Sequence, residues 1–172
     1  YLAWDGIRHD WIVTTTGNGI NMAATLDPAK INIARGKLNG GEQGFTFSVW
    51  FNPYDLDGGQ QVIAAKNRYS LGERQWSLAI EPNGTLSAYL SQGKWKVITS
   101  RVRPEAGRWH QAKLTVSAAK GVLYVDGKPV GAAALATPIT PTQAPITLGG
   151  VNDNGLLRQQ LLGAVDEAHY EE

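Results

Sequence analysis

The stretch GRWHQAKLTV, residues 107–116, places a histidine beside a tryptophan, a combination that could belong to an active site. Successive side chains of a β-strand point to opposite faces, so the strand predicted here would separate the two rings. His110 then shares a face with the apolar Ala112 and Leu114, whereas Trp109 lies on the other face at the start of the strand. We therefore predict a structural His110 at the rim of the core, bonded to backbone or a neighbouring strand, and a more exposed Trp109.

Carboxylate catalysis is a second possible chemistry, because retaining glycoside hydrolases use two acids about 5–5.5 Å apart. Asp55 and Asp57 lie in a Gly-flanked loop, and Glu81 precedes a proline turn. Asp166 and Glu167 are adjacent, so a strand would point them to opposite faces. No HExxH or GxSxG motif accompanies the three histidines. The sequence thus predicts a domain with no catalytic residues, and a glycoside hydrolase stays as an alternative.

Asp166 is also a candidate metal ligand. It lies at alternate positions of the predicted strand with Ala164, Ala168 and Tyr170, so these side chains share one face. That face is predicted to be inward or strongly covered. A carboxylate there must be paired or must bind a cation, because an isolated buried charge is very costly. Two interpretations stay open, namely a contact with an arginine or the backbone, and a calcium site.

Sugar recognition is a third chemistry, and it needs an aromatic face ringed by planar amide, carboxylate and guanidinium groups. Two segments offer this mixture, NRYSLGERQW at 67–76 and GGVNDNGLLRQQ at 149–160. The candidates are Asn67, Arg68, Tyr69, Glu73, Arg74, Gln75 and Trp76 in the first segment, and Asn152, Asp153, Asn154, Arg158, Gln159 and Gln160 in the second. Loops on a rigid scaffold commonly carry binding residues. We predict that these two segments bind carbohydrate.

Trp95, in the stretch GKWKVITSR, could add an aromatic platform to this site. It lies on the same face of the predicted strand as Val97 and Thr99, so it could also cover the edge of a sheet. We predict that Trp95 binds sugar, and ordinary packing is the alternative for this residue and for each of the other candidates.

The elements that must position these residues are β-strands, because period-2 alternation recurs along the chain and no long window keeps an apolar stripe at helical spacing. The predicted strands cover 31–35, 45–52, 61–66, 75–81, 85–90, 95–102, 109–117, 121–127, 144–150 and 163–170, and the first fourteen residues add one or two more. Residues 132–145 predict a loop with an edge segment. We expect an all-β fold in which two antiparallel sheets pack as a sandwich.

Net charge, cysteine content and the length of the apolar runs exclude several classes of partner. Sixteen Lys and Arg against fifteen Asp and Glu leave a net charge of +1, which is too weak a field to favour nucleic acid. The absence of cysteine excludes disulfides and thiolate metal sites. No apolar run approaches the roughly 20 residues that span a bilayer, so we expect no membrane insertion. The 172 residues fit one domain, 1–172, and Tyr1 at the start suggests a piece excised from a larger multidomain protein.

Four ordered motifs resemble the laminin-G-like or concanavalin-A-like jelly-roll domains of bacterial extracellular proteins. They are Trp4-Asp5-Gly6 with Asp10-Trp11-Ile12-Val13, then GFTFSVWFNP at 44–53, then GRWHQAKLTV with LYVDGKPVG at 123–131, and last GAVDEAHY at 163–170. The resemblance covers nearly the whole chain and implies a jelly-roll β-sandwich. It also implies that Trp50 is structural and that Trp109 packs where a loop folds over the sheet.

The resemblance further implies a structural Ca²⁺ held by Asp5, Asp166 and a backbone carbonyl around Gly44, since calcium prefers hard oxygen ligands. It implies carbohydrate binding or adhesion beside a catalytic domain, and it does not name the sugar. We therefore predict a non-catalytic carbohydrate-binding module of a secreted or cell-surface bacterial polysaccharide-degrading protein, with a glycan and an adjacent catalytic domain as partners. The alternative hypothesis is a structural or protein-adhesion domain packed against a neighbouring catalytic domain.

Overall fold

The computed structural model describes residues 2–5, 10–13, 24–25 and 44–172, with side chains from residue 44 onward. The strands are β1 (Leu2–Asp5), β2 (Asp10–Val13), β3 (Ala24–Thr25), β4 (Phe45–Pro53), β5 (Gln61–Arg68), β6 (Glu73–Ile80), β7 (Leu86–Ser91), β8 (Trp95–Thr99), β9 (His110–Val116), β10 (Lys120–Val125), β11 (Lys128–Ala134), β12 (Ile146–Leu148), β13 (Val151–Asp153), β14 (Leu156–Arg158) and β15 (Gly163–Glu171). A 3-10 turn, η2 (Tyr69–Leu71), follows β5. In these described ranges no helix is long and apolar enough to cross a membrane.

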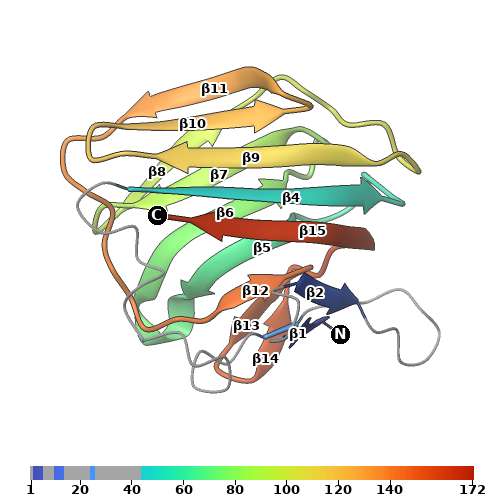
Figure 1. The fold of residues 1–172 in the computed structure, drawn as a ribbon, viewed down its shortest axis with the longest axis horizontal. Coiled ribbons are helices and arrows are strands. Elements are labelled where there is room, and N and C mark those ends of the chain that lie inside the picture. Colours follow the sequence, from blue (N-terminus) through green and yellow to red (C-terminus); the bar gives the residue numbers. More distant parts are fainter. Residues whose placement is uncertain (1, 6–9, 14–23, 26–43) are drawn as a thin grey trace.

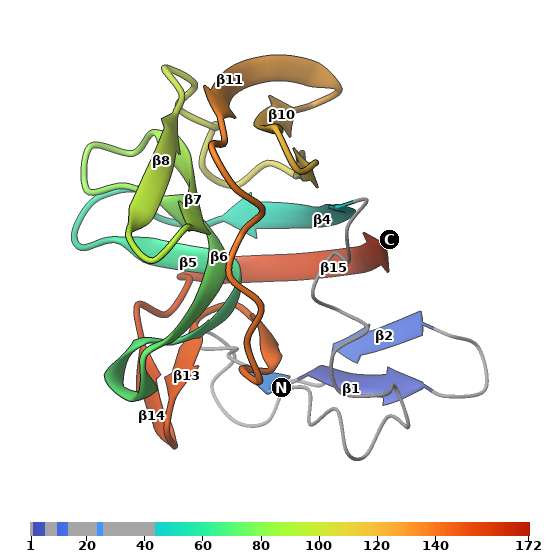
Figure 2. The same ribbon diagram turned by 90° about the vertical axis from the view of Figure 1, so that its left-hand side faces the viewer.

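Two antiparallel sheets form the body of the molecule (Figures 1 and 2). One sheet has five strands in the order β11-β10-β9-β4-β15, and the other has six in the order β3-β12-β5-β6-β7-β8. Strands β1 and β2 pair as one separate hairpin, and β13 and β14 pair as another. Figure 2 shows β7 and β8 at the left of the molecule and β4 and β15 to their right. The predicted all-β, two-sheet antiparallel jelly-roll sandwich is confirmed.

The core lies between the two sheets and follows from alternation along the strands. In β4, Phe45, Phe47, Val49 and Phe51 are buried, and the residues between them are half-buried. The ring of Trp76, on β6 of the facing sheet, lies 4.8 Å from that of Phe47. Burying a side chain of this size contributes roughly 1.5–3 kcal/mol. This packing holds the two sheets together.

The outer face of the six-stranded sheet is covered in part. Val62, Ala65 and Ala79 of this sheet form a second buried cluster with Val151 of β13, and Tyr89 of β7 packs at its margin. The β13–β14 hairpin thus lies over the β5 and β6 part of the face. Farther along the face, the outward side chains of β8 are accessible to solvent. The partial cover leaves a boundary at which a site can form.

The edge strand β11 was not predicted as a strand. Pro129 and Gly131 interrupt its alternation, and most of its other side chains are small. An edge strand tolerates proline because one side of its backbone needs no partner. The structure gives a strand to every other predicted stretch that it describes, with ends shifted by a few residues. The predicted strand at 31–35 lies outside the described residues.

The second predicted sugar-binding segment is a hairpin and not a plain loop. Its turn is at Asn154 and Gly155, which have φ of 56° and 89°. Positive φ at both central positions is the requirement of the tight turn that Asn-Gly pairs favour. The hairpin could therefore have been predicted from these two residues.

A bulge in β6 changes which face its side chains point to. Lys66 lies opposite Trp76 and Asn67 lies opposite Arg74, so Gln75 is an extra residue in the ladder. Trp76 points into the core and Arg74 points to the outer face, although simple alternation would place both on one side. The bulge is the reason that one segment contributes to both faces.

A second bulge, in β15, corrects the prediction that Asp166 faces inward. The register shifts between Asp166 and His169, and Glu167 has a positive φ of 47°. Val165 and Ala168 are both buried, while Asp166 is exposed. The alternation on which the prediction rested does not continue through the bulge.

Candidate functional site

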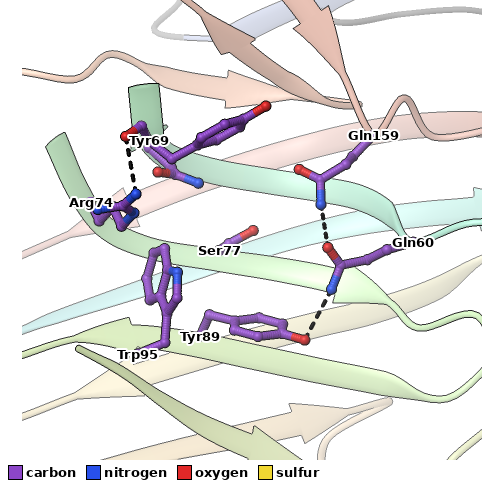
Figure 3. Close-up of a pocket in the computed structure, with 8 residues that line it drawn as sticks. Gln60, Tyr69, Arg74, Ser77, Tyr89, Trp95 and Gln159 are labelled. Carbon is purple, nitrogen blue, oxygen red and sulfur yellow. Dashed lines mark hydrogen bonds between the residues drawn. The ribbon is translucent and has the colours of Figure 1, made fainter. Parts of the chain in front are cut away.

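A pocket of about 310 Å³ lies on the outer face of the six-stranded sheet, next to the β13–β14 hairpin (Figure 3). Its lining residues are Gln60, Asn67, Tyr69, Arg74, Ser77, Tyr89, Trp95 and Gln159. Three of them are aromatic, three carry amides, and one carries a guanidinium group. This volume is at the small end of the roughly 300–1,000 Å³ typical of ligand sites.

The floor of the pocket comes from paired residues of neighbouring strands. Ser77 of β6 lies directly opposite Tyr89 of β7, and Trp95 of β8 pairs with Ser91 two residues farther along β7. Side chains two residues apart on a strand share a face, so Tyr89 and Trp95 both point outward. Their ring centroids are 5.9 Å apart, and the rings meet edge to face at 78°. They form two aromatic surfaces at a steep angle to each other.

Tyr69 supplies a third ring from the η2 turn (Figure 3). Figure 3 shows its ring and that of Tyr89 on opposite sides of Ser77. The guanidinium group of Arg74 donates to the carbonyl oxygen of Tyr69 at 3.1 Å. The turn and the start of β6 are thereby held together at this end of the pocket.

A chain of hydrogen bonds forms the opposite end of the pocket. The Gln159 amide donates to Oε1 of Gln60, and the Gln60 amide donates to the hydroxyl of Tyr89 at 2.9 Å. The Tyr89 hydroxyl donates in turn to Oε1 of Glu81 at 2.6 Å. Burial, together with the hydrogen bond to Glu81, raises the pKa of Tyr89 to about 12. Tyr89 therefore stays protonated at neutral pH and this end of the pocket keeps its hydrogen bonds.

Asn67 lines the pocket and has a buried carbonyl oxygen without a partner in the described part of the chain. Only 7% of this residue is exposed, and its Oδ1 has no hydrogen-bond partner among the described residues. A buried carbonyl oxygen left without a partner costs on the order of 1–3 kcal/mol. A ligand hydroxyl would recover that energy if the Asn67 side chain turned its oxygen to the pocket.

Asp153 joins the two predicted segments. Its Oδ1 accepts from the backbone N–H of Ser70 at 3.0 Å and from the Ser70 hydroxyl at 2.7 Å. Burial alone would raise the pKa of Asp153, but hydrogen bonds from Ser70 and Tyr69 and the charge of Arg158 lower it below the ordinary value. Asp153 is 3% exposed, so it positions the η2 turn and does not itself contact a ligand.

The structure brings together five of the predicted sugar-binding residues, namely Asn67, Tyr69, Arg74, Trp95 and Gln159. Gln159 comes from the second predicted segment and lies just after the end of β14. Gln60, Ser77 and Tyr89 were missed. Ser77 and Tyr89 each stand between inward-pointing residues of a strand, so strict alternation could have placed both on the outer face.

Two predicted residues of the first segment pair with each other outside the pocket. Arg68 and Glu73 form an ion pair at 2.5 Å. The prediction that Trp76 binds sugar is wrong. Its side chain is fully buried in the core against Phe45 and Phe47 and cannot reach a sugar.

The remaining predicted residues of the second segment lie in or near the hairpin turn. Oδ1 of Asn152 accepts from the backbone N–H of Gly155 at 2.7 Å. Asn154 occupies the turn itself, and Arg158 is exposed at the end of β14. These side chains shape the hairpin, and none of them lines the pocket.

The calcium prediction finds no support in the positions of its ligands. Asp166 lies opposite Trp50, which is six residues from Gly44 along the chain, a separation of about 20 Å in an extended strand. Calcium ligands lie about 2.3–2.6 Å from the ion, so Gly44 and Asp166 cannot share one. The side chain of Asp5 lies outside the description. No cluster of three His, Asp or Glu residues suited to a metal occurs in the described part of the chain.

The histidine that raised the question of catalysis is structural, as predicted. Nδ1 of His110 donates to Oδ2 of Asp126 at 2.8 Å, which leaves Nε2 to accept from the backbone N–H of Glu105 at 3.1 Å. Trp109 is 47% exposed, so the implication that it packs beneath a loop is wrong. The preceding loop is tied to His110 through the backbone of Glu105.

None of the residues lining the pocket is an acid. Glu81 lies behind the lining, where it accepts from Gln60 and Tyr89. General acid–base chemistry on a glycosidic bond needs a pair of carboxylates that flank it. The arrangement suits binding through ring faces and hydrogen bonds.

The family model for the concanavalin A-like lectin/glucanases superfamily matches residues 27–170. No curated protein sequence matches the chain. Among solved structures, the chain is similar to the CBM40 of the Ruminococcus gnavus IT-sialidase bound to α2,3-sialyllactose, with a TM-score of 0.69 and 12% identity over 88% of this chain and 85% of that one.

Two further structures are similar over a smaller share of their own length. Domain 4 of an extracellular arabinanase from Geobacillus stearothermophilus, in complex with arabinotriose, has a TM-score of 0.55 and 17% identity over 76% of this chain and 61% of that one. A SAP-like pentraxin from Limulus polyphemus has a TM-score of 0.55 and 17% identity over 75% of this chain and 63% of that one. At these identities the similarity concerns the fold.

Proposed function

We propose that this chain, which belongs to the concanavalin A-like lectin/glucanases superfamily, is a non-catalytic carbohydrate-binding module whose site is the pocket beside the β13–β14 hairpin. The observation that carries the proposal is the convergence of Tyr69, Tyr89 and Trp95 with the amides of Gln60 and Asn67 in one pocket. Aromatic faces bind the apolar side of a sugar ring, and amides bind its hydroxyls. The small volume suits the end of a glycan.

Two of the similar structures support this proposal through the ligands in their names, which are sialyllactose and arabinotriose. We further propose that the module belongs to a secreted or cell-surface bacterial protein that degrades polysaccharides. A glycan-binding module attached to an enzyme raises the effective concentration of the enzyme at its substrate.

A glycan array with the isolated chain tests the proposal, followed by calorimetry on the glycans that bind. Trp95→Ala should lower the affinity at least about tenfold, because it removes one aromatic surface of the pocket. Trp109→Ala is the matched control, since it removes an exposed indole far from the pocket and should leave the affinity unchanged. No binding to any glycan, or equal losses in both variants, would contradict the proposal.

Protein adhesion is a second candidate, favoured by an apolar surface next to the pocket. Leu71 of η2 and Leu156 and Leu157 of β14 are all exposed. The Ser70–Asp153 bonds hold η2 against the hairpin, which brings these leucines to the same end of the molecule. If adhesion is the function, Leu156→Ser with Leu157→Ser should abolish binding to a neighbouring domain and Trp95→Ala should not.

A further inference from the structure

Arg74 differs from the other arginines that lie near acidic residues. Arg68 pairs with Glu73, Arg103 pairs with Asp57 at 3.3 Å, and Arg108 pairs with Glu105 at 2.8 Å. Arg74 is half-buried and lines the pocket, yet it forms no ion pair with any residue in the described part of the chain. Its recorded polar contact is a single hydrogen bond to the carbonyl of Tyr69. Most of its five N–H donors are therefore available to a ligand.

The register of β5 and β6 explains why the neighbouring acid does not neutralise Arg74. Asn67 lies opposite Arg74, and the next pair along the ladder is Arg68 with Glu73. Successive pairs point to opposite faces, so the Asn67–Arg74 pair faces the pocket and the Arg68–Glu73 pair faces away from it. Arg68 therefore holds the Glu73 carboxylate on the other side of the sheet.

None of the residues that line the pocket carries a charge opposite to that of Arg74. Two carboxylates lie behind the lining, and neither forms an ion pair with Arg74. Glu81 accepts hydrogen bonds from Gln60 and Tyr89 at the end opposite Arg74, and Asp153 accepts from Ser70 and Tyr69. A partly buried cation without an ion-pair partner favours the binding of an anion there.

We infer that the pocket selects a saccharide with an anionic substituent, a carboxylate or a sulfate, and that Arg74 binds this substituent; the inference rests on the proposed function. The planar guanidinium group can form two parallel hydrogen bonds to either anion. The acceptor of Asn67 and the aromatic rings then bind the hydroxyls and the ring of the same sugar. Neutral sugars lack the group that Arg74 requires and bind more weakly.

The experiment measures wild-type affinity by calorimetry for matched pairs of saccharides that differ only in charge. The carboxylate pairs are trigalacturonate with its methyl ester and methyl glucuronoside with methyl glucoside; the sulfate pair is galactose 6-sulfate with galactose. Sialyllactose and its methyl ester form a further pair. In at least one pair we expect the anionic member to bind at least about tenfold more tightly, because hydrogen bonds to a charged group are stronger than those between neutral groups. The binding pair identifies the anion as carboxylate or sulfate.

Arg74→Gln should remove this preference and lower the affinity for the anionic member to that of its neutral partner. Arg108→Gln is the control, because that arginine is exposed and lies on another loop. Higher salt should weaken binding of the anionic member more than that of the neutral one. Equal binding within every pair would overturn this inference and leave the proposed function standing. A glycan array with no binding at all would overturn both.

Discussion

Lys66 is the buried charge whose effect on stability is simplest to isolate. It is 5% exposed, and Nζ donates to the carbonyl oxygens of Ala144 at 2.6 Å and Thr142 at 3.3 Å. Burial lowers the pKa of Lys66 to about 8 from an ordinary value of 10.5, although the charge of Glu73 acts in the opposite direction. The lysine ties the segment before β12 to the core face of β5.

Because the folded state releases this proton more readily, the unfolded state binds more protons between pH 8 and 10.5. The free energy of unfolding of the wild type should therefore rise with pH in that window, by at most about 1.4 kcal/mol per unit. Urea unfolding of the wild type and Lys66→Met at several pH values checks this, because the variant should lack the rise. Parallel pH profiles of the two proteins would contradict the burial of a charged Lys66.

Asp153 should affect both stability and binding. Asp153→Asn weakens the bonds to Ser70, so we expect a loss of about 1–2 kcal/mol at neutral pH and a lower glycan affinity from a displaced Tyr69. The pKa of Asp153 is lowered in the folded state, so its contribution is present above the ordinary pKa and is lost as pH falls through the folded value. Thermal unfolding of the variant and wild type should therefore converge in acid.

The control for this prediction is Asp57→Asn, which alters an exposed ion pair with Arg103. Exposed pairs contribute little to stability. If Asp57→Asn is as destabilising as Asp153→Asn, or if the difference between Asp153→Asn and wild type persists in acid, the role given to Asp153 is wrong.

At the scale of single elements, the sequence predicted the strands better than the faces of their side chains. Regular alternation in β4 and β9 placed Phe47 and His110 correctly. The bulges at Gln75 and Asp166 could not be predicted, because a bulge depends on the register with a partner strand and leaves no local pattern in the residues themselves. Asp166 was misplaced for this reason. Trp76 was predicted as a sugar ligand from the composition of its segment, although alternation with the core residues Leu78 and Ile80 would have placed it inside.

Strand β11 was missed because its residues do not alternate, and its position depends on a close contact between the sheets. A Cβ atom at Gly131 would lie 2.7 Å from the carbonyl oxygen of Thr99 and 2.8 Å from Cγ2 of Ile98. Gly131 thus allows β11 to approach β8 at the edge of the sandwich.

Gly131→Ala should therefore lower the free energy of unfolding by about 1–3 kcal/mol, the usual cost of overpacking. Ala132→Ser, a change at the exposed neighbouring position, is the control and should have little effect. Guanidinium unfolding of both variants tests the contact. Unchanged stability of Gly131→Ala would show that β11 and β8 lie farther apart.

At the scale of the whole molecule, the resemblance and the strand pattern predicted the sandwich, but the pocket required the assembled fold. Gln60 and Gln159 are 99 residues apart and meet through a hydrogen bond. Tyr89 joins them only because β7 lies next to β6 in the sheet. Composition selected two polar segments, and residues of both line the pocket; the sheet between them supplies the rest of the lining.

The most direct measurement of the central claim is a two-dimensional NMR spectrum of the tryptophan indole N–H groups during titration with a glycan that the array identifies. Trp50, Trp95 and Trp109 are each assigned by the loss of one signal in a variant that lacks that tryptophan. If the sugar binds in the pocket, the Trp95 signal shifts in proportion to occupancy and the Trp109 signal does not move. A shift of Trp109 or Trp50 with Trp95 unchanged would place the sugar on the other sheet and contradict the account.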